Sequence, residues 1–168
     1  MIEDRLLLTA RAVGTRSSNL SLTRKLARSL LGALVEIMVR SNEDARRAPA
    51  FQRHDVLLFE HVSVLERRPV SGANPAASKT TDTVSDEPSV LPPQLLQKID
   101  LSVADANLQM RLVSTSDHVV EFRFPRDVGH QLIHVLMVKC RDACWGFSEF
   151  DWIDRRANIV IPNGLRPS

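Results

Sequence analysis

Two pairs of potential metal ligands occur at one-turn spacing in a segment with helical periodicity. His130 and His134 are four residues apart, a spacing that zinc sites use, and Cys140 and Cys144 repeat it. Fourteen residues of helix are about 21 Å long, too far for one ion to join all four side chains. We therefore expect Cys140 in the core and the histidines on a solvated face. A zinc site of two histidines and another segment is the alternative; no metal or cofactor is expected.

A second group of residues has the chemistry of a binding surface. Arginine binds oxyanions through paired hydrogen bonds, and tryptophan is frequent at binding hot spots. The candidate binding residues are Arg46, Arg47, Arg53, His54, Trp145, Trp152, Arg155 and Arg156. They suit a surface that grips phosphate or an acidic protein. The alternative is that the charges are solvated loop residues and that the aromatic segment is a lid over a small core.

Arg24 and Arg126 each open a predicted helix. The helix dipole opposes a cation in the first turn. Such an arginine is expected either to pair with a nearby carboxylate or to point at an anion, with a simply exposed side chain as the alternative.

Motifs for catalysis are absent. The sequence has no P-loop, no G-x-G-x-x-G, no H-E-x-x-H, no C-x-x-C and no nucleophile elbow. We therefore expect a non-catalytic cytoplasmic protein that binds another protein or complex, as an adaptor, an assembly subunit or a small inhibitor. The alternative is nucleic-acid binding through the Arg-rich N-terminal part, and a small enzyme is the weakest reading.

Composition is ordinary for a soluble globular protein. Apolar residues make up 43% of the 168 residues and charged residues 25%, which suits one compact domain or two very small ones. No apolar run is long enough to span a bilayer, and no secretory leader begins at Met1. Residues 1–70 carry 12 basic and 8 acidic side chains, a net charge of +4. This excess favours an anionic partner only mildly.

Two β-hairpins are predicted from alternating apolar residues. In the second hairpin, pairing Leu112 with Val120 and Met110 with Phe122 places every apolar side chain on one face. The same register sets Arg111 opposite Glu121, a favourable cross-strand pair. The turn then falls at 115–117, where an aspartate tolerates the left-handed conformation.

The N-terminal hairpin is predicted by the same rule, that the apolar side chains of both strands lie on one face. It pairs Leu6 with Leu22, Leu8 with Leu20 and Ala10 with Ser18, with the turn at Gly14. An amphipathic helix is expected after each hairpin, the first capped by Thr23 and ending near residue 41, the second following Pro125 and ending near residue 144. The second helix is expected to bury one face, formed by Val128, Leu132, Val135, Leu136, Cys140 and Ala143.

The two halves of the chain match under a gap-free shift of about 102 residues. Each half then ends in a predicted strand, at residues 55–65 and at Ile159–Ile161. The expected fold is α+β, with two tandem β-β-α-β modules related by a pseudo-twofold axis, each packing its antiparallel hairpin on one long helix. Two unrelated segments of the same class are the alternative.

The domain organisation follows from these modules. The first module spans residues 1–68 and the second spans 95–168, and the two are expected to share one core. Residues 69–94 are rich in Pro, Ser and Thr and are read as a linker. Residues 95–103 then lead into the second module as a short helix or an extra strand.

Overall fold

The computed structural model describes residues 5–10, 18–67 and 92–153. The chain forms an α+β fold with one five-stranded mixed sheet. The strands are β1 (Arg5–Ala10), β2 (Ser18–Thr23), β3 (Gln94–Ala104), β4 (Asn107–Ser114) and β5 (Val119–Pro125). The helices are α1 (Arg24–Ser41), α2 (Glu43–Arg47), α3 (Arg53–Arg67) and α4 (Arg126–Asp142), with short 3-10 turns η1 (Ala50–Gln52) and η2 (Ser148–Phe150).

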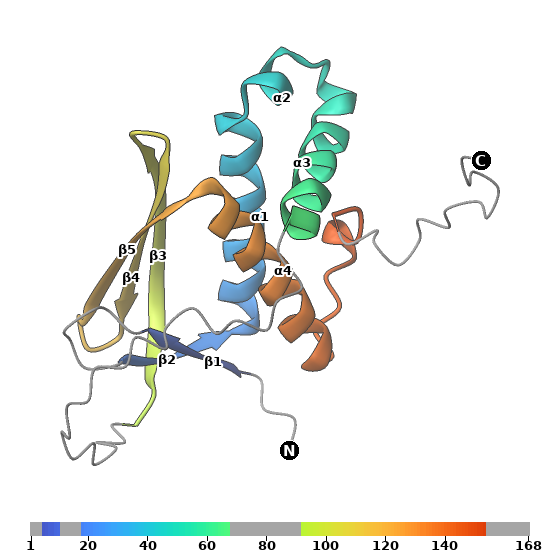
Figure 1. Cartoon of the computed structure of the whole chain (residues 1–168). Coiled ribbons are helices and arrows are strands. Elements are labelled where there is room, and N and C mark those ends of the chain that lie inside the picture. The colour runs from blue at the N-terminus through green and yellow to red at the C-terminus, as the bar shows by residue number, and fades with distance from the viewer. Residues whose placement is uncertain (1–4, 11–17, 68–91, 154–168) are drawn as a thin grey trace, which may run out of the picture.

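The sheet has the strand order β1-β2-β3-β4-β5. β1 pairs with β2, and β3, β4 and β5 form an antiparallel meander. β2 joins β3 in parallel through only two residue pairs, Leu20 with Gln94 and Ser21 with Leu95. The N-terminal hairpin therefore crosses one end of β3 (Figure 1).

Both predicted hairpin registers are confirmed. Leu6 pairs with Leu22 and Leu8 with Leu20 in the first hairpin. In the second, Leu112 pairs with Val120, Met110 pairs with Phe122, and Arg111 lies opposite Glu121. The turn of this hairpin holds Asp117 in the left-handed conformation, with φ of 59°. The requirement that the apolar side chains of both strands lie on one face was therefore sufficient to fix the register.

The helices cover one face of the sheet in two layers. α1 and α4 lie against the strands, and α3 packs on the far side of this helix pair (Figure 1). α1 begins at Thr23, whose hydroxyl accepts a hydrogen bond from the Leu26 amide, as the sequence predicts. No helix in the described ranges is long and apolar enough to cross a bilayer.

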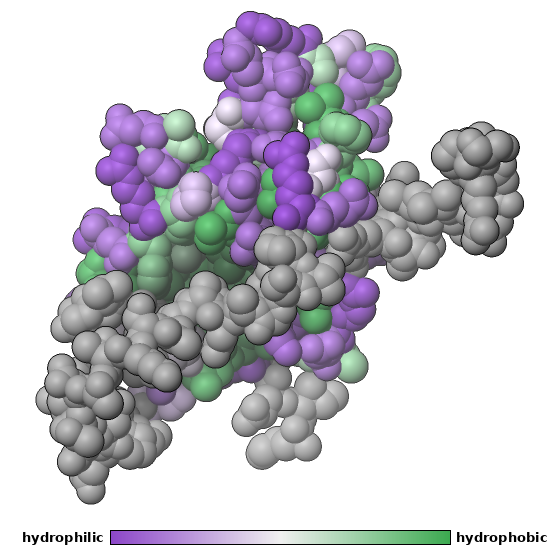
Figure 2. Space-filling view, viewed as in Figure 1, coloured by the Kyte–Doolittle hydropathy of each residue, from purple (hydrophilic) through white to green (hydrophobic). Residues whose placement is uncertain are grey.

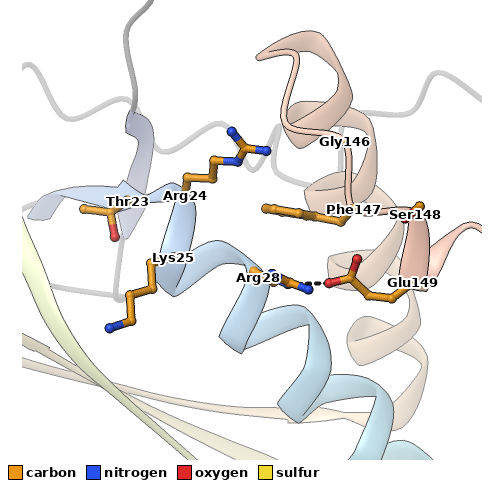
Figure 3. Close-up of a pocket in the computed structure, with 8 residues that line it drawn as sticks. All are labelled: Thr23, Arg24, Lys25, Arg28, Gly146, Phe147, Ser148 and Glu149. Carbon is orange, nitrogen blue, oxygen red and sulfur yellow. Dashed lines mark hydrogen bonds and ion pairs between the residues drawn. The ribbon is translucent and has the colours of Figure 1, made fainter.

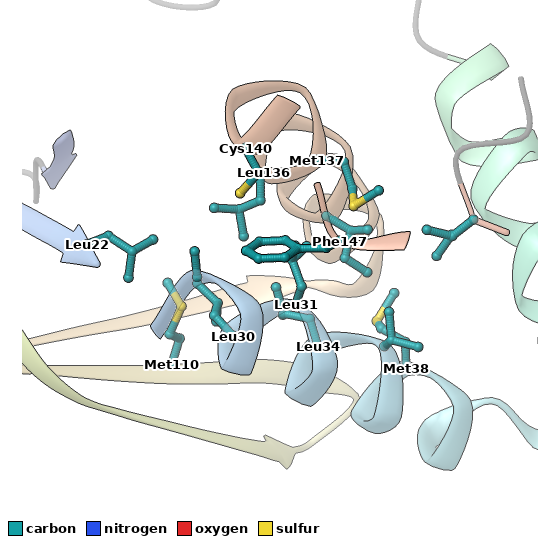
Figure 4. Close-up of a cluster of buried hydrophobic side chains, with 14 of the residues drawn as sticks. Leu22, Leu30, Leu31, Leu34, Met38, Met110, Leu136, Met137, Cys140 and Phe147 are labelled. Carbon is teal, nitrogen blue, oxygen red and sulfur yellow. The ribbon is translucent and has the colours of Figure 1, made fainter. Parts of the chain in front are cut away.

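One hydrophobic cluster takes residues from both halves of the chain. Phe147, which follows α4, inserts between the apolar faces of α1 and α4 (Figure 4). Cys140 is buried there, in the core position that its spacing predicts. The fully buried side chains include Leu20, Leu22, Leu31, Leu34, Met38, Leu57, Leu96, Leu112 and Ile133.

The strand predicted at residues 55–65 is wrong, because this segment belongs to the helix α3. Its β-branched and aromatic content suggested a strand, yet its buried residues are Leu57, His61 and Val64. These positions follow the i, i+4, i+7 spacing of one helix face. Burial against α1 and α4 therefore decided the structure over intrinsic propensity. The predicted strand Ile159–Ile161 lies outside the described residues.

The face of α4 that the sequence assigned to the core is also partly wrong. Leu136 and Cys140 are buried as expected, but Val128 and Val135 are exposed by 39% and 49%. The core side of the helix is rotated, because α4 must face α1 and α3 as well as the sheet. Its buried residues are Gly129, His130, Ile133, Leu136, Met137 and Cys140.

Two helix glycines give a matched pair of substitutions. A methyl group at Gly129 would lie 2.5 Å from Leu108 Cδ1 and 3.3 Å from Met38 Sδ, whereas one at Gly32 would lie 3.7 Å from Phe150. We expect Gly129→Ala to lower the free energy of unfolding by about 1–3 kcal/mol through overpacking. Gly32→Ala should raise it by about 0.5–1 kcal/mol through helix propensity. Urea unfolding of both variants measures these changes in the free energy of unfolding. Equal changes for the two variants would contradict the close α4–β4 contact.

Candidate functional site

A polar network joins the three long helices. Arg126, the first residue of α4, forms an ion pair with Glu60 of α3, and one bond of this pair is 2.8 Å. The same guanidinium donates to the Met38 carbonyl at 2.6 Å and to the Ser41 hydroxyl at the end of α1. Asn42 donates to the second Glu60 oxygen at 2.7 Å. One arginine thus satisfies carbonyl and carboxylate oxygens from two other helices.

Two histidines extend this network into the interior. Nδ1 of His61 and Nδ1 of His130 are 3.1 Å apart, so one of the two nitrogens must donate and the other accept. Nε2 of His130 lies 3.2 Å from Glu60 Oε1, although this nitrogen makes no well-directed hydrogen bond.

The environment of Glu60 sets its ionisation. Burial favours the neutral acid, but the hydrogen bond from Arg126, the close approach of His130 Nε2, the hydrogen bond from Asn42 and the charge of Arg126 together outweigh burial. The pKa of Glu60 therefore lies well below its usual value. The carboxylate stays ionised wherever the protein is folded near neutral pH.

The expectation that both histidines form a solvated face is wrong for His130, which is fully buried. It faces α3, because α4 packs against that helix, and residues 55–65 of α3 were predicted to form a strand. His134 is half-buried, with its ring centroid 6.4 Å from that of His61. No three His, Cys, Asp or Glu side chains in the described ranges are grouped as metal ligands. The structure therefore assembles no site for zinc from these residues.

A cleft opens between the first turn of α1 and the segment 146–149 (Figure 3). We call it the basic cleft; its volume is about 650 Å³, and it is lined by Thr23, Arg24, Lys25, Arg28, Gly146, Phe147, Ser148 and Glu149. Arg24 and Arg28 extend toward the 146–149 segment, whereas the Lys25 ammonium points away from it (Figure 3). Three cations and one carboxylate give this cleft an excess of positive charge.

Two contacts hold the basic cleft together. The guanidinium carbon of Arg24 lies 5.9 Å from the centre of the Phe147 ring, which is a cation–π distance. Arg28 forms an ion pair with Glu149. The pKa of Glu149 is lowered by its own backbone amide and by Arg28, so this carboxylate is ionised at neutral pH.

Most sequence-predicted binding residues are not gathered in one place. His54 and Trp152 do meet: their rings stack in parallel at 4.3 Å, joining the start of α3 to the segment after α4. Trp145 is buried in the core, with only 3% exposed. Arg46 and Arg53 are exposed, and Arg47 forms an ion pair with Glu43 one turn earlier. Arg155 and Arg156 lie outside the described residues.

The segment 145–153 crosses the helix layer. Phe147 fills the core, Glu149 reaches Arg28, Phe150 packs near Gly32, and Trp152 stacks on His54. These contacts proceed from the start of α1 to the start of α3. Trp145 and Phe147 of this segment are therefore core residues, whereas Phe150 and Trp152 are only partly buried.

Two other aromatic side chains are exposed instead. Phe51 and Phe59 have 79% and 77% of their surface accessible. Hydrophobic patches interrupt the hydrophilic surface where α2 and α3 meet (Figure 2). Sequence reasoning missed Phe59 because residues 55–65 were assigned to a strand, and it also missed Phe51, which lies in the short turn η1. The helical spacing of Leu57, His61 and Val64 is the signal that would have placed Phe59 on the outer face.

The thiols offer little for catalysis. Burial raises the pKa of Cys140, which disfavours the reactive thiolate. Cys144 is exposed, in the left-handed conformation with φ of 58°. The ion pair of Glu60 and Arg126 joins α3 to α4 and is also bonded to the end of α1, and this is the pattern of a structural network.

No protein-family model, curated protein or solved structure matches this chain.

Replacing Glu60 by glutamine tests the role of the network. We expect Glu60→Gln to lower the free energy of unfolding at pH 7 by about 3 kcal/mol, the lower limit for breaking a buried ion pair, because Glu60 keeps 23% of its side chain exposed. Urea unfolding measures the change. Glu36→Gln is the control, because the exposed pair of Glu36 and Arg40 should change stability by no more than about 0.5 kcal/mol.

The lowered pKa of Glu60 predicts that the stability difference between wild type and Glu60→Gln depends on pH. The folded-state pKa of Glu60 is lowered, so its stabilisation is complete above the unfolded-state pKa and is lost as pH falls toward the folded-state pKa. The difference between wild type and Glu60→Gln should shrink by about 1.4 kcal/mol per pH unit below about pH 4.3. A difference that stays constant from pH 7 to about pH 3 would show that charge is not what Glu60 contributes.

Proposed function

We propose that this protein is a non-catalytic cytosolic protein-binding module, such as an adaptor, an assembly subunit or a small inhibitor of a larger complex. The observation that carries the proposal is the exposure of Phe51 and Phe59 on the α2–α3 end of the molecule. Phenylalanine is usually buried, because each ring removes a large apolar area from water. Exposed aromatic side chains on a rigid helix are typical of binding hot spots.

The position of these rings supports their use in recognition. They are eight residues apart, which is about 12 Å along a helical path, so one partner surface can contact both. α3 itself is held by the network of Glu60 and Arg126 and by the stack of His54 on Trp152. The helix is therefore held on its inner side, while its outer side carries Phe59 and the preceding turn η1 carries Phe51. A preorganised surface loses less conformational entropy on binding.

The charge of this surface favours a protein partner over nucleic acid. Residues 42–67 carry five acidic and four basic side chains, so the α2–α3 end is close to neutral. Nucleic-acid surfaces depend on concentrated positive charge. The Arg-rich character of the N-terminal half is not concentrated around Phe51 and Phe59.

We also infer that the two β-β-α units are copies of one ancestral unit. β1, β2 and α1 begin at residues 5, 18 and 24, and β4, β5 and α4 begin at 107, 119 and 126, a nearly constant shift. The start of α4 lies at the end of α1, as an approximate twofold relation of the helices requires. The sheet does not follow such an axis, because β2 is internal while its counterpart β5 is an edge strand.

Site-specific photo-crosslinking tests the binding proposal. A benzophenone side chain at position 59 should form a discrete adduct with one protein in native-host extract, whereas the same probe at the exposed Glu121 should not. The adduct identifies the partner, which is then purified for affinity measurements. Nuclease treatment should leave the adduct intact; an adduct that depends on nucleic acid would overturn the proposal.

Substitution of the two rings gives the quantitative test. We expect the double variant Phe51→Ser with Phe59→Ser to weaken partner binding by about 30-fold or more, the loss typical of a hot spot. The free energy of unfolding should change by no more than about 0.5 kcal/mol, because neither ring is buried. Val135→Ser, at an exposed apolar position on α4, is the matched control and should bind normally. Equal binding by all three proteins would contradict the proposal.

A further inference from the structure

We propose that the basic cleft is a binding site for a phosphate monoester. The cleft lies beside the start of α1. η1 and α3, which carry the exposed phenylalanines, follow the other end of α1 in the chain. Because α1 is about 27 Å long, the two surfaces are separate. The proposal is therefore independent of the protein-binding function.

Charge in the basic cleft is the first argument. Arg24, Lys25 and Arg28 oppose a single carboxylate, Glu149, so two positive charges remain. A phosphate monoester carries close to two negative charges at neutral pH and matches this excess. The first turn of α1 contains no acidic residue, and the helix dipole adds to the positive potential there.

The lack of an internal partner for Arg24 is the second argument. Its counterpart Arg126, which opens the equivalent helix, is neutralised by Glu60. Within the described ranges, neither Arg24 nor Lys25 forms an ion pair. By contrast, each cation of β3, β4 and β5 pairs with a carboxylate, namely Lys98 with Asp100, Arg111 with Glu121 and Arg123 with Asp105. The cleft is a place where folding leaves cations without counter-ions.

Fixed geometry is the third argument. Arg24 rests over Phe147, which is itself buried in the core, so its guanidinium is held against a rigid ring. Arg28 is held by Glu149 on the opposite wall (Figure 3). A guanidinium presents paired donors that fit phosphate oxygens. Lys25 lies at the rim, where its flexible ammonium can turn toward a bound anion.

The cleft is larger than a phosphate group. A volume of about 650 Å³ is typical of sites that hold a small organic molecule. The monoester has two sources, a phosphorylated metabolite or a phosphorylated side chain of another protein. Ribose 5-phosphate and a phosphoserine tripeptide represent these two sources, and ribose and the unphosphorylated tripeptide are the matched neutral controls.

Isothermal titration calorimetry of the full chain with these four compounds tests the proposal. At least one phosphorylated probe should bind with millimolar affinity or better, its neutral control should not bind, and added salt should weaken binding. The compound that binds more tightly identifies the source. Absence of binding by both phosphorylated probes would overturn the proposal.

Variants locate the site. Arg24→Gln should weaken binding by about tenfold, because a hydrogen bond to a charged group is lost, and Lys25→Gln should weaken it less. Arg40→Gln, at the opposite end of α1, should bind as the wild type does. Glu149→Gln should bind several-fold more tightly, since it removes the competing carboxylate and frees Arg28. Thermal unfolding of each variant separates loss of binding from loss of fold; equal weakening by Arg24→Gln and Arg40→Gln would show nonspecific attraction only.

Discussion

The arrangement of the helices depends on one partly buried ion pair. Arg126 must sit where the end of α1, the middle of α3 and the start of α4 converge, because it bonds to oxygens of Met38, Ser41 and Glu60. Leaving either charged partner of the pair without the other would be costly, because both Arg126 and Glu60 are largely removed from water. The pair therefore acts as a constraint on geometry: α3 can pack on the helix layer only in the register that brings Glu60 to Arg126.

This constraint explains why local sequence patterns predicted the sheet better than the helix layer. A hairpin has two strands close in sequence, and only one register places Leu112, Met110 and Leu108 on the same face as their partners. The position of α3 depends instead on contacts with residues about 70 positions later, such as His61 with His130. Residues 55–65 have the composition of a strand, and the helical spacing of Leu57, His61 and Val64 becomes decisive only when these distant contacts bury that face.

The candidate sites show the same difference between what local sequence predicts and what the whole fold decides. The sequence identified arginine and aromatic residues as binding candidates, and it gave Arg24 and Arg126 two alternatives, a carboxylate or an anion. Burial settled which side chains are available, and burial is a property of the whole fold. Trp145 and Phe147 became core residues, because a small helix layer needs large rings to fill it. Phe59 became a surface residue, because α3 has only one face toward α1 and α4, and Phe51 is exposed in the turn η1 that precedes α3.

The two equivalent arginines, Arg24 and Arg126, differ in whether the fold neutralises their charge. Each opens a helix against the dipole, so each requires negative charge nearby. At Arg126 the chain supplies Glu60 from α3, and the result is a fixed helix junction. At Arg24 the corresponding space is filled by Phe147, an aromatic ring that orients a guanidinium without neutralising it. The same local sequence pattern thus builds a closed ion pair in one half of the chain and leaves an open cation in the other, and only the open cation has charge available for a ligand.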